Sequence, residues 1–447
     1  MTYPRGVKRT AAGAAGLSVA VLLTACSNAA PDAPGETGTA GDEKITVQLA
    51  HWGGDWNENE VYKPRIEAFM AEHPNIIVEP LPVAEEYETK MTTLINAGQA
   101  PTLMQVAENG TRWAGAFRDL TTQIEAEGWD LAERFGGAAE LYNDGNIQFA
   151  VPDRGGSTVL YFNKDLFEEA GLPLPDENFT VDDYYNALEK ITALSGTIDV
   201  DGDGQGDPIW GGTGTHYQAA WGAFLLGNGG SIIEFDAEGE PVVTVNSPQN
   251  AEVFDRWVGA YANDWILPYE NTVEKGGDAW FQSGNVGMNM TGFWVVKGYA
   301  ETEGLNWDMS TIPLGEVESG WPMGSGFAIS AQASDEEAAA AWEVAKYLSG
   351  DEGQAYLAET LADAPASLEA LTNLQYETVD GNPVSVDRFA IVQQRLTTID
   401  GYVRGPWYSE VNNESRTQVR NAVEGAITVP ELLENLEENL TKIVARY

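Results

Sequence analysis

The sequence predicts an α/β fold with a parallel sheet and more than one compact part. Short apolar strands alternate with amphipathic helical stretches early in the chain, an order typical of parallel sheets covered by helices on both faces. Of the 447 residues, 43% are hydrophobic, and a single core of that size would be unusual. We therefore expect two or more domains or lobes.

The expected elements follow from the apolar pattern. Strands are expected at residues 45–50, 76–78, 103–106, 149–152 and 159–162. Helices between the first three strands have apolar stripes formed by Val61, Ile66, Phe69 and Met70, and by Tyr87, Met91, Leu94 and Ile95. Four more helices are predicted at residues 181–194, 248–263, 334–349 and 430–445. Thr180 caps the first of these, and Pro430 suits the first turn of the last.

The N-terminal segment has the features of an export signal. Three basic side chains, Arg5, Lys8 and Arg9, precede an apolar run at residues 11–23 that is too short and alanine-rich for a membrane span. The run ends in Leu-Thr-Ala-Cys, which resembles the lipobox of bacterial lipoproteins, with Cys26 as the lipid-bearing residue. Cys26 is the only cysteine in the chain. The alternative is an ordinary secretory signal in which this cysteine stands by chance.

These features predict a signal peptide at residues 1–25 and a lipid-anchored flexible linker at residues 26–43. The linker is rich in Ala, Pro, Gly and Thr, so it cannot bury a core. The lipobox resemblance implies that the protein is a lipoprotein carrying a palmitate-type anchor at the extracellular face of the cell membrane. No second apolar stretch of the sequence reaches transmembrane length.

Charge and composition exclude several classes of function. The net charge is −45, and residues 1–25 hold three basic and no acidic side chains, so the remainder carries −48. Such a chain repels nucleic acid. The three histidines form no zinc motif, and the sequence has neither a Gly-x-Ser-x-Gly elbow nor a phosphate loop. Aromatic residues are abundant, with 14 Trp and 17 Tyr. We expect a monomeric binding protein without a catalytic cofactor, not an enzyme.

Several segments together resemble a known family. Residues 159–172, VLYFNKDLFEEAGL, are similar to a segment of the extracellular sugar-binding proteins of ABC importers. Residues 101–105, 287–294 and 324–330 resemble further segments of that family in the same order, and Asp351-Glu352-Gly353-Gln354 follows an alanine-rich helix as it does there. The resemblance spans most of the chain after the linker and does not specify the sugar.

The resemblance implies a two-lobed periplasmic-binding-protein-like fold, with the ligand in the cleft between the lobes. A hinge that the chain crosses several times would join the lobes and allow closure around ligand. The expected boundaries are 44–151 plus 310–350 for lobe 1, and 152–309 plus 351–447 for lobe 2. The crossings are expected near Val151, Ser310 and Gly350.

The loop after the first strand fits sugar recognition. Sugars present C–H faces that stack on aromatic rings, and hydroxyls that need charged or amide partners. Trp52, Asp55 and Trp56 lie in this loop, at the carboxyl end of a strand, where ligands bind in open α/β sheets. By resemblance, Asp55 stands where the family has a ligand-binding acid. The alternative is that Trp52 or Trp56 packs against the neighbouring helix.

Further ligand-binding residues of the first lobe follow from the resemblance. Glu108 and Asn109 come after the third strand and occupy the place of a family acid. Asp153 matches another family carboxylate, although a solvated hinge acid is an equal alternative. We also expect Glu86, or Glu85 beside it, to reach the cleft from the second loop.

In the second lobe, Trp294 matches the position where the family stacks a tryptophan on a sugar ring. Arg404 stands beside the aromatic turn at residues 405–408, where it would bind sugar hydroxyls or form a surface ion pair instead. The further candidates are Trp221, Trp280, Trp321, Tyr402, Arg404 and Trp407. Trp257, Trp307 and Trp342 lie in periodic or strand-like segments and are expected in the core.

One acidic loop predicts a possible structural Ca²⁺ site. Oxygen-bearing side chains alternate with other residues, and glycine stands sixth, as in an EF-hand loop. The proposed ligands are Asp199, Asp201, Asp203, Gln205 and Asp207. Trp210 takes the twelfth position, where the pattern has a bidentate Glu, so a remote acid would have to supply that ligand. The alternative is an Asp- and Gly-rich turn without an ion.

The leading hypothesis is a carbohydrate-binding subunit of an ABC transporter, which binds an oligosaccharide and delivers it to permease subunits. A secreted glycoside hydrolase is an alternative, since carboxylates beside aromatic rings also form such sites. The acidic composition suggests a third possibility, a binding protein for a cationic ligand such as a polyamine.

Overall fold

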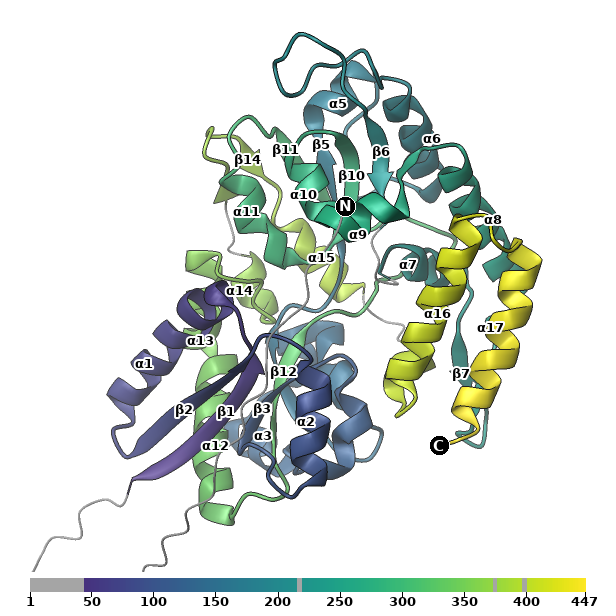
Figure 1. The fold of residues 1–447 in the computed structure, drawn as a ribbon. Helices are drawn as coiled ribbons and strands as arrows, with labels where there is room; N and C mark the ends of the chain where they lie inside the picture. The colour runs from purple at the N-terminus through teal and green to yellow at the C-terminus, as the bar shows by residue number, and fades with distance from the viewer. Residues whose placement is uncertain (1–43, 215–218, 373–375, 396–399) are drawn as a thin grey trace, which may run out of the picture. The chain divides into compact units, whose positions relative to one another are not determined.

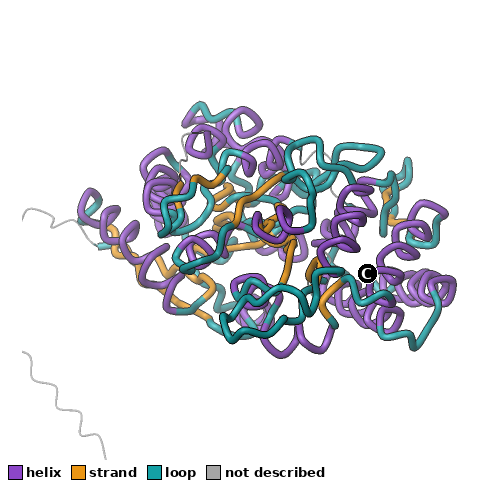
Figure 2. Tube along the Cα trace, turned by 90° about the horizontal axis from the view of Figure 1, so that it is seen from above, coloured by secondary structure: helices purple, strands orange, loops and turns teal. Residues whose placement is uncertain are grey.

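A computed structural model describes residues 44–214, 219–372, 376–395 and 400–447. Within these residues the strands form two five-stranded sheets and two short two-stranded ribbons. Figure 1 shows both large sheets with helices packed around them, and Figure 2 shows helices flanking the strands from a second direction. Residues 44–447 form one compact unit. The predicted signal peptide, the linker and Cys26 lie outside the described residues.

The first sheet has the strand order β2-β1-β3-β12-β4. Its strands are β1 (Ile45–Trp52), β2 (Ile76–Val83), β3 (Leu103–Ala107), β4 (Ala150–Arg154) and β12 (Ser325–Ile329). β1 runs parallel to β2 and β3, as expected. β12 runs antiparallel to both β3 and β4, so the sheet is mixed and the expectation of a purely parallel sheet is wrong. The alternation of strands and helices early in the sequence could not predict that β12, from a distant part of the chain, would enter this sheet.

Neighbouring residues of each strand point to opposite faces of the first sheet, and helices bury both faces. Leu103 and Phe327 face a core cluster that includes α1 (Lys63–Glu72) and α12 (Asp335–Ser349). Met104 and Ala328 face a second cluster with α2 (Tyr87–Asn96). The apolar side chains in these strands are therefore enclosed by helices on both sides.

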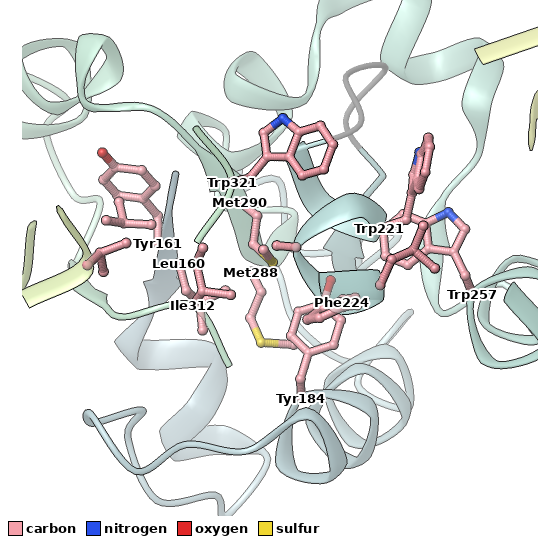
Figure 3. Close-up of a cluster of buried hydrophobic side chains, with 14 of the residues drawn as sticks. Leu160, Tyr161, Tyr184, Trp221, Phe224, Trp257, Met288, Met290, Ile312 and Trp321 are labelled. Carbon is pink, nitrogen blue, oxygen red and sulfur yellow. The ribbon is translucent and has the colours of Figure 1, made fainter. Parts of the chain in front are cut away.

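The second sheet has the strand order β11-β5-β10-β6-β9. Its strands are β5 (Val159–Asn163), β6 (Trp210–Thr213), β9 (Ile266–Leu267), β10 (Val286–Thr291) and β11 (Trp307–Ser310). β5 pairs antiparallel with β10 and β11, whereas β6 pairs parallel with β9 and β10. Figure 3 shows part of the core beside this sheet, where Met288 and Met290 of β10 lie among aromatic rings.

Helices predicted by periodicity lie close to their expected bounds. α6 (Val181–Thr192) begins after Thr180, whose side chain accepts a hydrogen bond from the amide of Asp183. α8 (Pro248–Ala262) and α12 also match their predictions. α17 (Val429–Val444) has Pro430 in its first turn and packs its leucine stripe against α16 (Tyr408–Val423) and α8.

The remaining elements are shorter or connect the sheets. The other helices are α3 (Thr121–Glu127), α4 (Leu131–Phe135), α5 (Lys164–Glu169), α7 (Ala219–Gly227), α9 (Tyr269–Lys275), α10 (Gly277–Gln282), α11 (Val296–Ala300), α13 (Asp351–Thr360), α14 (Leu368–Thr372) and α15 (Arg388–Gln394). Short segments of π-helix or 3₁₀-helix are η1 (Asn57–Tyr62), η2 (Gly110–Ala116), η3 (Gly136–Tyr142), η4 (Phe293–Val295) and η5 (Gly401–Arg404). The ribbons pair β7 (Ile233–Phe235) with β8 (Pro241–Val243), and β13 (Tyr376–Glu377) with β14 (Pro383–Val384).

The lobe boundaries stay a prediction. The chain leaves the first sheet after β4, returns to it at β12, and then forms α12 and α13. Leu357 of α13 packs in a core cluster of the first sheet, beyond the boundary expected at residue 350. Among the described residues, no helix is long and apolar enough to cross a membrane.

Four buried charged side chains meet at the edge of the first sheet. Arg65 of α1 donates to both carboxylate oxygens of Asp153, at 2.8 and 3.3 Å. Arg154 donates to Asp363 at 2.7 Å and lies 3.9 Å from Asp153. We call these four residues the charge quartet. It links α1, β4 and the segment after α13, and Arg65 and Asp153 are almost completely shielded from water.

Replacing Arg65 with methionine is expected to lower the free energy of unfolding by about 3–5 kcal/mol, because Asp153 would keep a buried charge without its main partner. Chemical denaturation measures this loss. Arg118→Met is the matched control, because Arg118 pairs with Asp335 at the similar distance of 2.9 Å, but that carboxylate is 98% exposed. The control should lose about 1 kcal/mol or less. Equal losses in the two variants would contradict this account.

Candidate functional site

A cavity of about 230 Å³ lies among residues of both sheets and their loops. Strand β1 and η1 contribute one wall, β4 and the residues after it another, and the loop after β10 a third. The lining residues are Trp52, Trp56, Asn57, Glu108, Arg154, Gly155, Ser157, Gly292, Phe293, Trp294, Met323, Gly324, Ser325 and Asp363. Aromatic rings and polar groups thus line one small, partly open cavity.

Trp52 and Trp56 are held at this cavity by the packing of the β1 loop. The ring of Trp52 lies against Tyr87, with ring centres 4.8 Å apart, and its amide donates to the side chain of Gln105 at 3.2 Å. Trp56 immediately precedes η1 and packs partly on the core of the first sheet. Both indoles are half-buried and line the cavity. Trp52 and Trp56 therefore both pack against the fold and line the cavity, although the sequence analysis treated these two roles as alternatives.

Trp294 presents an exposed aromatic face to the cavity. Its side chain is 40% exposed, unusual for so large an apolar group. The ring lies directly over Gly292, where an added Cβ would stand 1.9 Å from a ring carbon. Because Gly292 has no side chain, the indole can lie close to the backbone, which restricts its movement. This is the geometry of a fixed stacking surface.

Arg154 is the most deeply held polar group of the cavity. Its Nε donates to Ser325 Oγ at 3.0 Å, and Nη1 donates to Asn57 at 3.0 Å as well as to Asp363. Ser325 also accepts from Gln105 Nε2 at 2.9 Å. Burial raises the pKa of Asp363, and the positive charge of Arg154 opposes that rise. The network fixes the guanidinium in one position.

Glu108 has a strongly altered acidity. Its residue is half-buried, but the carboxyl lies deep enough that burial raises its pKa to about 7. The Tyr408 hydroxyl donates to Glu108 Oε1 at 3.3 Å, which partly opposes this rise. Near neutral pH the group is therefore present in both protonation states, and can accept or donate hydrogen bonds.

The segment that follows Glu108 contacts elements from the C-terminal part of the chain. Thr111 donates to the carbonyl of Val403 at 3.2 Å, and Arg112 Nη1 donates to Ser409 at 2.8 Å. Lys297 of α11 forms an ion pair with Glu60 of η1. The first two contacts join η2, which follows β3, to residues 403–409. The ion pair joins η1, which follows β1, to α11.

Four of the predicted ligand-binding residues line the cavity: Trp52, Trp56, Glu108 and Trp294. The other candidates of the first lobe lie elsewhere. Asp55 is exposed and accepts from Asn59 at 2.9 Å, and Glu86 is an exposed residue at the start of α2. Asn109 is buried beside Glu108 in the chain, outside the lining. Asp153 is fully buried and bound to Arg65, so its carboxylate stabilises the fold instead of standing at a solvated hinge.

The other candidates of the second lobe do not line this cavity either. Trp221 and Trp321 are buried in the core shown in Figure 3, at 3% and 5% exposure. Trp280 donates to the carbonyl of Asn271 at 3.3 Å and packs on the core. Tyr402 and Trp407 are also buried, and Arg404 is exposed on η5. The expected core positions of Trp257, Trp307 and Trp342 are confirmed.

Sequence reasoning missed most of the polar cavity wall. Asn57 directly follows a predicted tryptophan, and Arg154 directly follows Asp153, so both stood beside residues that had been singled out. Ser325 lies in a segment that carried the family resemblance, but nothing marked its hydroxyl. Asp363 has no sequence feature that separates it from other acids, because it reaches the cavity only through the turn after α13.

A larger cavity of about 570 Å³ lies by α13 and α14. Its lining has one aromatic residue, Tyr376, with Asp351, Glu359, Glu369 and several alanines. It offers no stacking surface comparable to the three indoles of the smaller cavity. Size alone therefore does not make it the better ligand site.

The acidic loop between α6 and β6 brings three of its five predicted ligands together. Carboxylate oxygens of Asp199, Asp201 and Asp207 lie within 4.8 Å of one another. Asp203 accepts instead from the amide of Gln205 at 2.8 Å. Backbone amides also donate to Asp199 and Asp207, as expected for a turn without an ion. The Ca²⁺ site stays a prediction.

The cavity and fold were compared with known proteins. Residues 53–355 match the family model described as bacterial extracellular solute-binding protein. A lactose-binding protein of Rhizobium radiobacter is 28% identical over 207 residues, which are 44% of this chain and 44% of that relative, so the chain matches less than half the relative's length.

Solved structures share the fold. An ABC substrate-binding protein from Listeria monocytogenes in complex with cycloalternan has a TM-score of 0.73 at 20% identity, over 90% of this chain and 99% of that one. A maltose-bound protein of T. maritima has a TM-score of 0.72 at 20% identity, over 89% and 100%. Both likenesses extend over the two sheets that line the cavity. With the family model covering most of the same region, the chain belongs to the bacterial extracellular solute-binding proteins.

Proposed function

We propose that this protein is the sugar-binding component of an ABC importer, which captures an oligosaccharide outside the membrane and delivers it to permease subunits. The observation that carries this proposal is the cavity, where three indoles stand beside Asn57, Glu108 and Arg154. Indole faces stack on the C–H faces of sugars, and the polar groups bind hydroxyls. Relatives named for lactose, cycloalternan and maltose support a saccharide ligand.

The cavity favours an oligosaccharide that enters by one end. Its volume of about 230 Å³ is below the ~300–1,000 Å³ of pockets for drug-sized ligands, so it encloses only a small part of a larger molecule. Trp294 keeps 40% of its surface exposed and offers a stacking face for a neighbouring sugar unit. One enclosed unit and one stacked unit require at least two linked sugars.

The two alternative functions fit the cavity less well. Hydrolysis of a glycosidic bond needs two carboxyl groups placed across that bond. The lining carboxylates are Glu108 and Asp363, and Asp363 is already bound to Arg154. A polyamine site would have carboxylates facing a cationic ligand, whereas the guanidinium of Arg154 would repel it. A binding role toward a neutral ligand fits these charges best.

Calorimetric titration with maltose, maltotriose, lactose and cellobiose tests the function. At least one sugar is expected to bind without yielding shorter products. Trp294→Ala should weaken that affinity by about tenfold or more, because the stacking surface and its apolar contact are lost. Binding of a polyamine or peptide but of no sugar would sink the proposal.

Phe235→Ala is the matched control for Trp294→Ala. Phe235 of β7 is a similarly exposed aromatic residue, at 43%, and does not line the cavity. Its removal should leave sugar affinity within about twofold of the wild type. If both variants lost affinity equally, the effect of Trp294→Ala would reflect general disturbance of the fold.

Glu108→Gln is expected to stabilise the protein at alkaline pH. The pKa of Glu108 is raised from 4.5 to about 7 on folding, so its contribution to stability is lost as pH rises between these values. Glutamine cannot ionise, and the variant should gain about 1–3 kcal/mol at pH 8 and nothing near pH 4. Urea denaturation across this range measures the difference. Glu189→Gln, on the exposed face of α6, should show no such trend.

We also propose that Cys26 carries a lipid that tethers the protein to the extracellular face of the cell membrane, with residues 26–43 as the linker. The lipobox resemblance supports this proposal. Cells labelled with a palmitate analogue should incorporate it into the wild type, and Cys26→Ala should abolish the label and release the protein from the membrane fraction. Label that persists in Cys26→Ala would refute the anchor. Ser27→Ala is the control and should remain labelled.

A further inference from the structure

Arg112 lies outside the cavity and bridges two separately packed parts of the molecule. It belongs to η2, which follows Glu108 in the chain, and its side chain is only 9% exposed. The guanidinium carbon stands 4.1 Å from the centre of the Trp113 ring and 6.0 Å from that of Tyr408. Trp113 packs in a core of the first sheet, whereas Tyr408 packs on the core beside the second sheet.

The same guanidinium anchors the start of α16. Its Nη1 donates to Ser409 Oγ at 2.8 Å, and Ser409 is next to Tyr408 in the first turn of that helix. On its other side, Nη2 lies 3.9 Å from Glu88 Oε1 of α2, a side chain that is 40% exposed. A hydrogen bond and a contact with an aromatic ring thus connect η2 to α16.

Arg112 is an unfavourable residue for the fold alone. Burial lowers its pKa, so the charged form is held against the preference of its surroundings. Its Nε and Nη2 are buried and make no hydrogen bond to the residues that the structure describes. A buried cation without a close ion pair costs free energy. Stability alone therefore does not account for an arginine at this position.

Tyr408 connects Arg112 to the cavity. Its hydroxyl donates to Glu108 Oε1 at 3.3 Å, and Glu108 lines the cavity, whereas Tyr408 and Arg112 do not. A glutamate side chain has considerable rotamer freedom, and a partner that holds its carboxyl before ligand arrives reduces the entropy lost on binding. The hydroxyl can hold this carboxyl only while the first turn of α16 stays in place.

We propose that Arg112 is a positioning residue, which holds the first turn of α16 against η2 so that Tyr408 keeps the carboxyl of Glu108 in place at the cavity wall. The proposal rests on the sugar-binding function, and Arg112 acts without contacting the ligand. An arginine suits this task because its planar guanidinium can lie over an aromatic ring while its edge donates a hydrogen bond. Lysine, with a compact ammonium, cannot do both.

Calorimetric titration with the tightest-binding sugar among maltose, maltotriose, lactose and cellobiose tests this role. Arg112→Met keeps much of the bulk of the side chain and removes its donors and its charge. The variant should bind about three- to tenfold more weakly, as expected for the loss of one hydrogen bond. Its melting temperature should stay close to that of the wild type, because Ser409 and Glu88 remain in contact with water.

A double-mutant cycle with Tyr408→Phe separates positioning from general packing. Tyr408→Phe keeps the ring and removes the hydroxyl that contacts Glu108, so it should also lose about three- to tenfold in affinity. If Arg112 acts through that hydroxyl, adding Arg112→Met to Tyr408→Phe should weaken binding by less than about twofold more. Additive losses would overturn the proposal, because Arg112 would then affect affinity by another route.

Arg134→Met is the matched control. Arg134 also lies over an indole, 4.7 Å from the centre of the Trp129 ring, pairs with one acid, Asp351, and does not line the cavity. Its replacement should leave sugar affinity within about twofold of the wild type. An equal loss in Arg134→Met, or unchanged affinity in folded Arg112→Met, would overturn the role of Arg112.

Ser409→Ala keeps the proposal testable if Arg112→Met fails to fold. Ser409 is exposed, and its replacement breaks the hydrogen bond from Arg112, so the affinity should fall by about two- to fivefold. Unchanged affinity in Ser409→Ala would overturn the proposal. The wild-type titration distinguishes the two possible failures. A wild type that binds none of the sugars removes the sugar-binding function and this role with it, whereas sugar binding that survives unchanged in the variants removes only the role of Arg112.

Discussion

The pairing of four buried charges is the constraint on which both the fold and the cavity depend. Asp153 and Arg154 are neighbours on β4, and each binds a partner of opposite charge from a different segment, Arg65 on α1 and Asp363 after α13. Breaking the pair between Arg65 and Asp153 would leave a charge in a place that water cannot reach, and breaking the other pair would leave a charge at the cavity wall. The same pairing brings Asp363 to the cavity and fixes the guanidinium that faces it. The contacts that pair the charges at this edge of the sheet therefore also hold part of the cavity wall.

The aromatic wall of the cavity depends on a different constraint, the close approach of an indole to backbone. Trp294 is 40% exposed, yet its ring lies close against the backbone of Gly292, which restricts its movement. Trp52 is fixed in turn by contact with Tyr87 and by the hydrogen bond that its backbone amide donates to Gln105 Oε1. Exposed rings held in this way lose little freedom when a ligand arrives, which makes them efficient binding surfaces. Glu108 differs from these fixed groups, because burial raises its pKa to about 7 and its protonation therefore changes near neutral pH.

Much of the fold was predictable because it is local. The periodicity of residues 181–194 and the cap at Thr180 specify α6 from neighbouring residues alone. The cavity was predictable only where an aromatic or acidic residue follows a strand, as at Trp52 and Glu108. Trp321 and Trp294 look alike in sequence, but one is buried and the other exposed, because burial is decided by segments far away in the chain. Asp363 could not be predicted for the same reason, because it reaches the cavity by pairing with Arg154, which lies 209 positions away in the sequence.

The place of β12 in the first sheet has a consequence for the order of folding. It lies between β3 and β4, and the hydrogen bond from Gln105 to Ser325 joins residues 220 positions apart. Until residues 325–329 are in place, β4 has no strand beside it and β3 pairs only with β1. Pairing over so long a separation is slow, because the intervening chain must be brought together first.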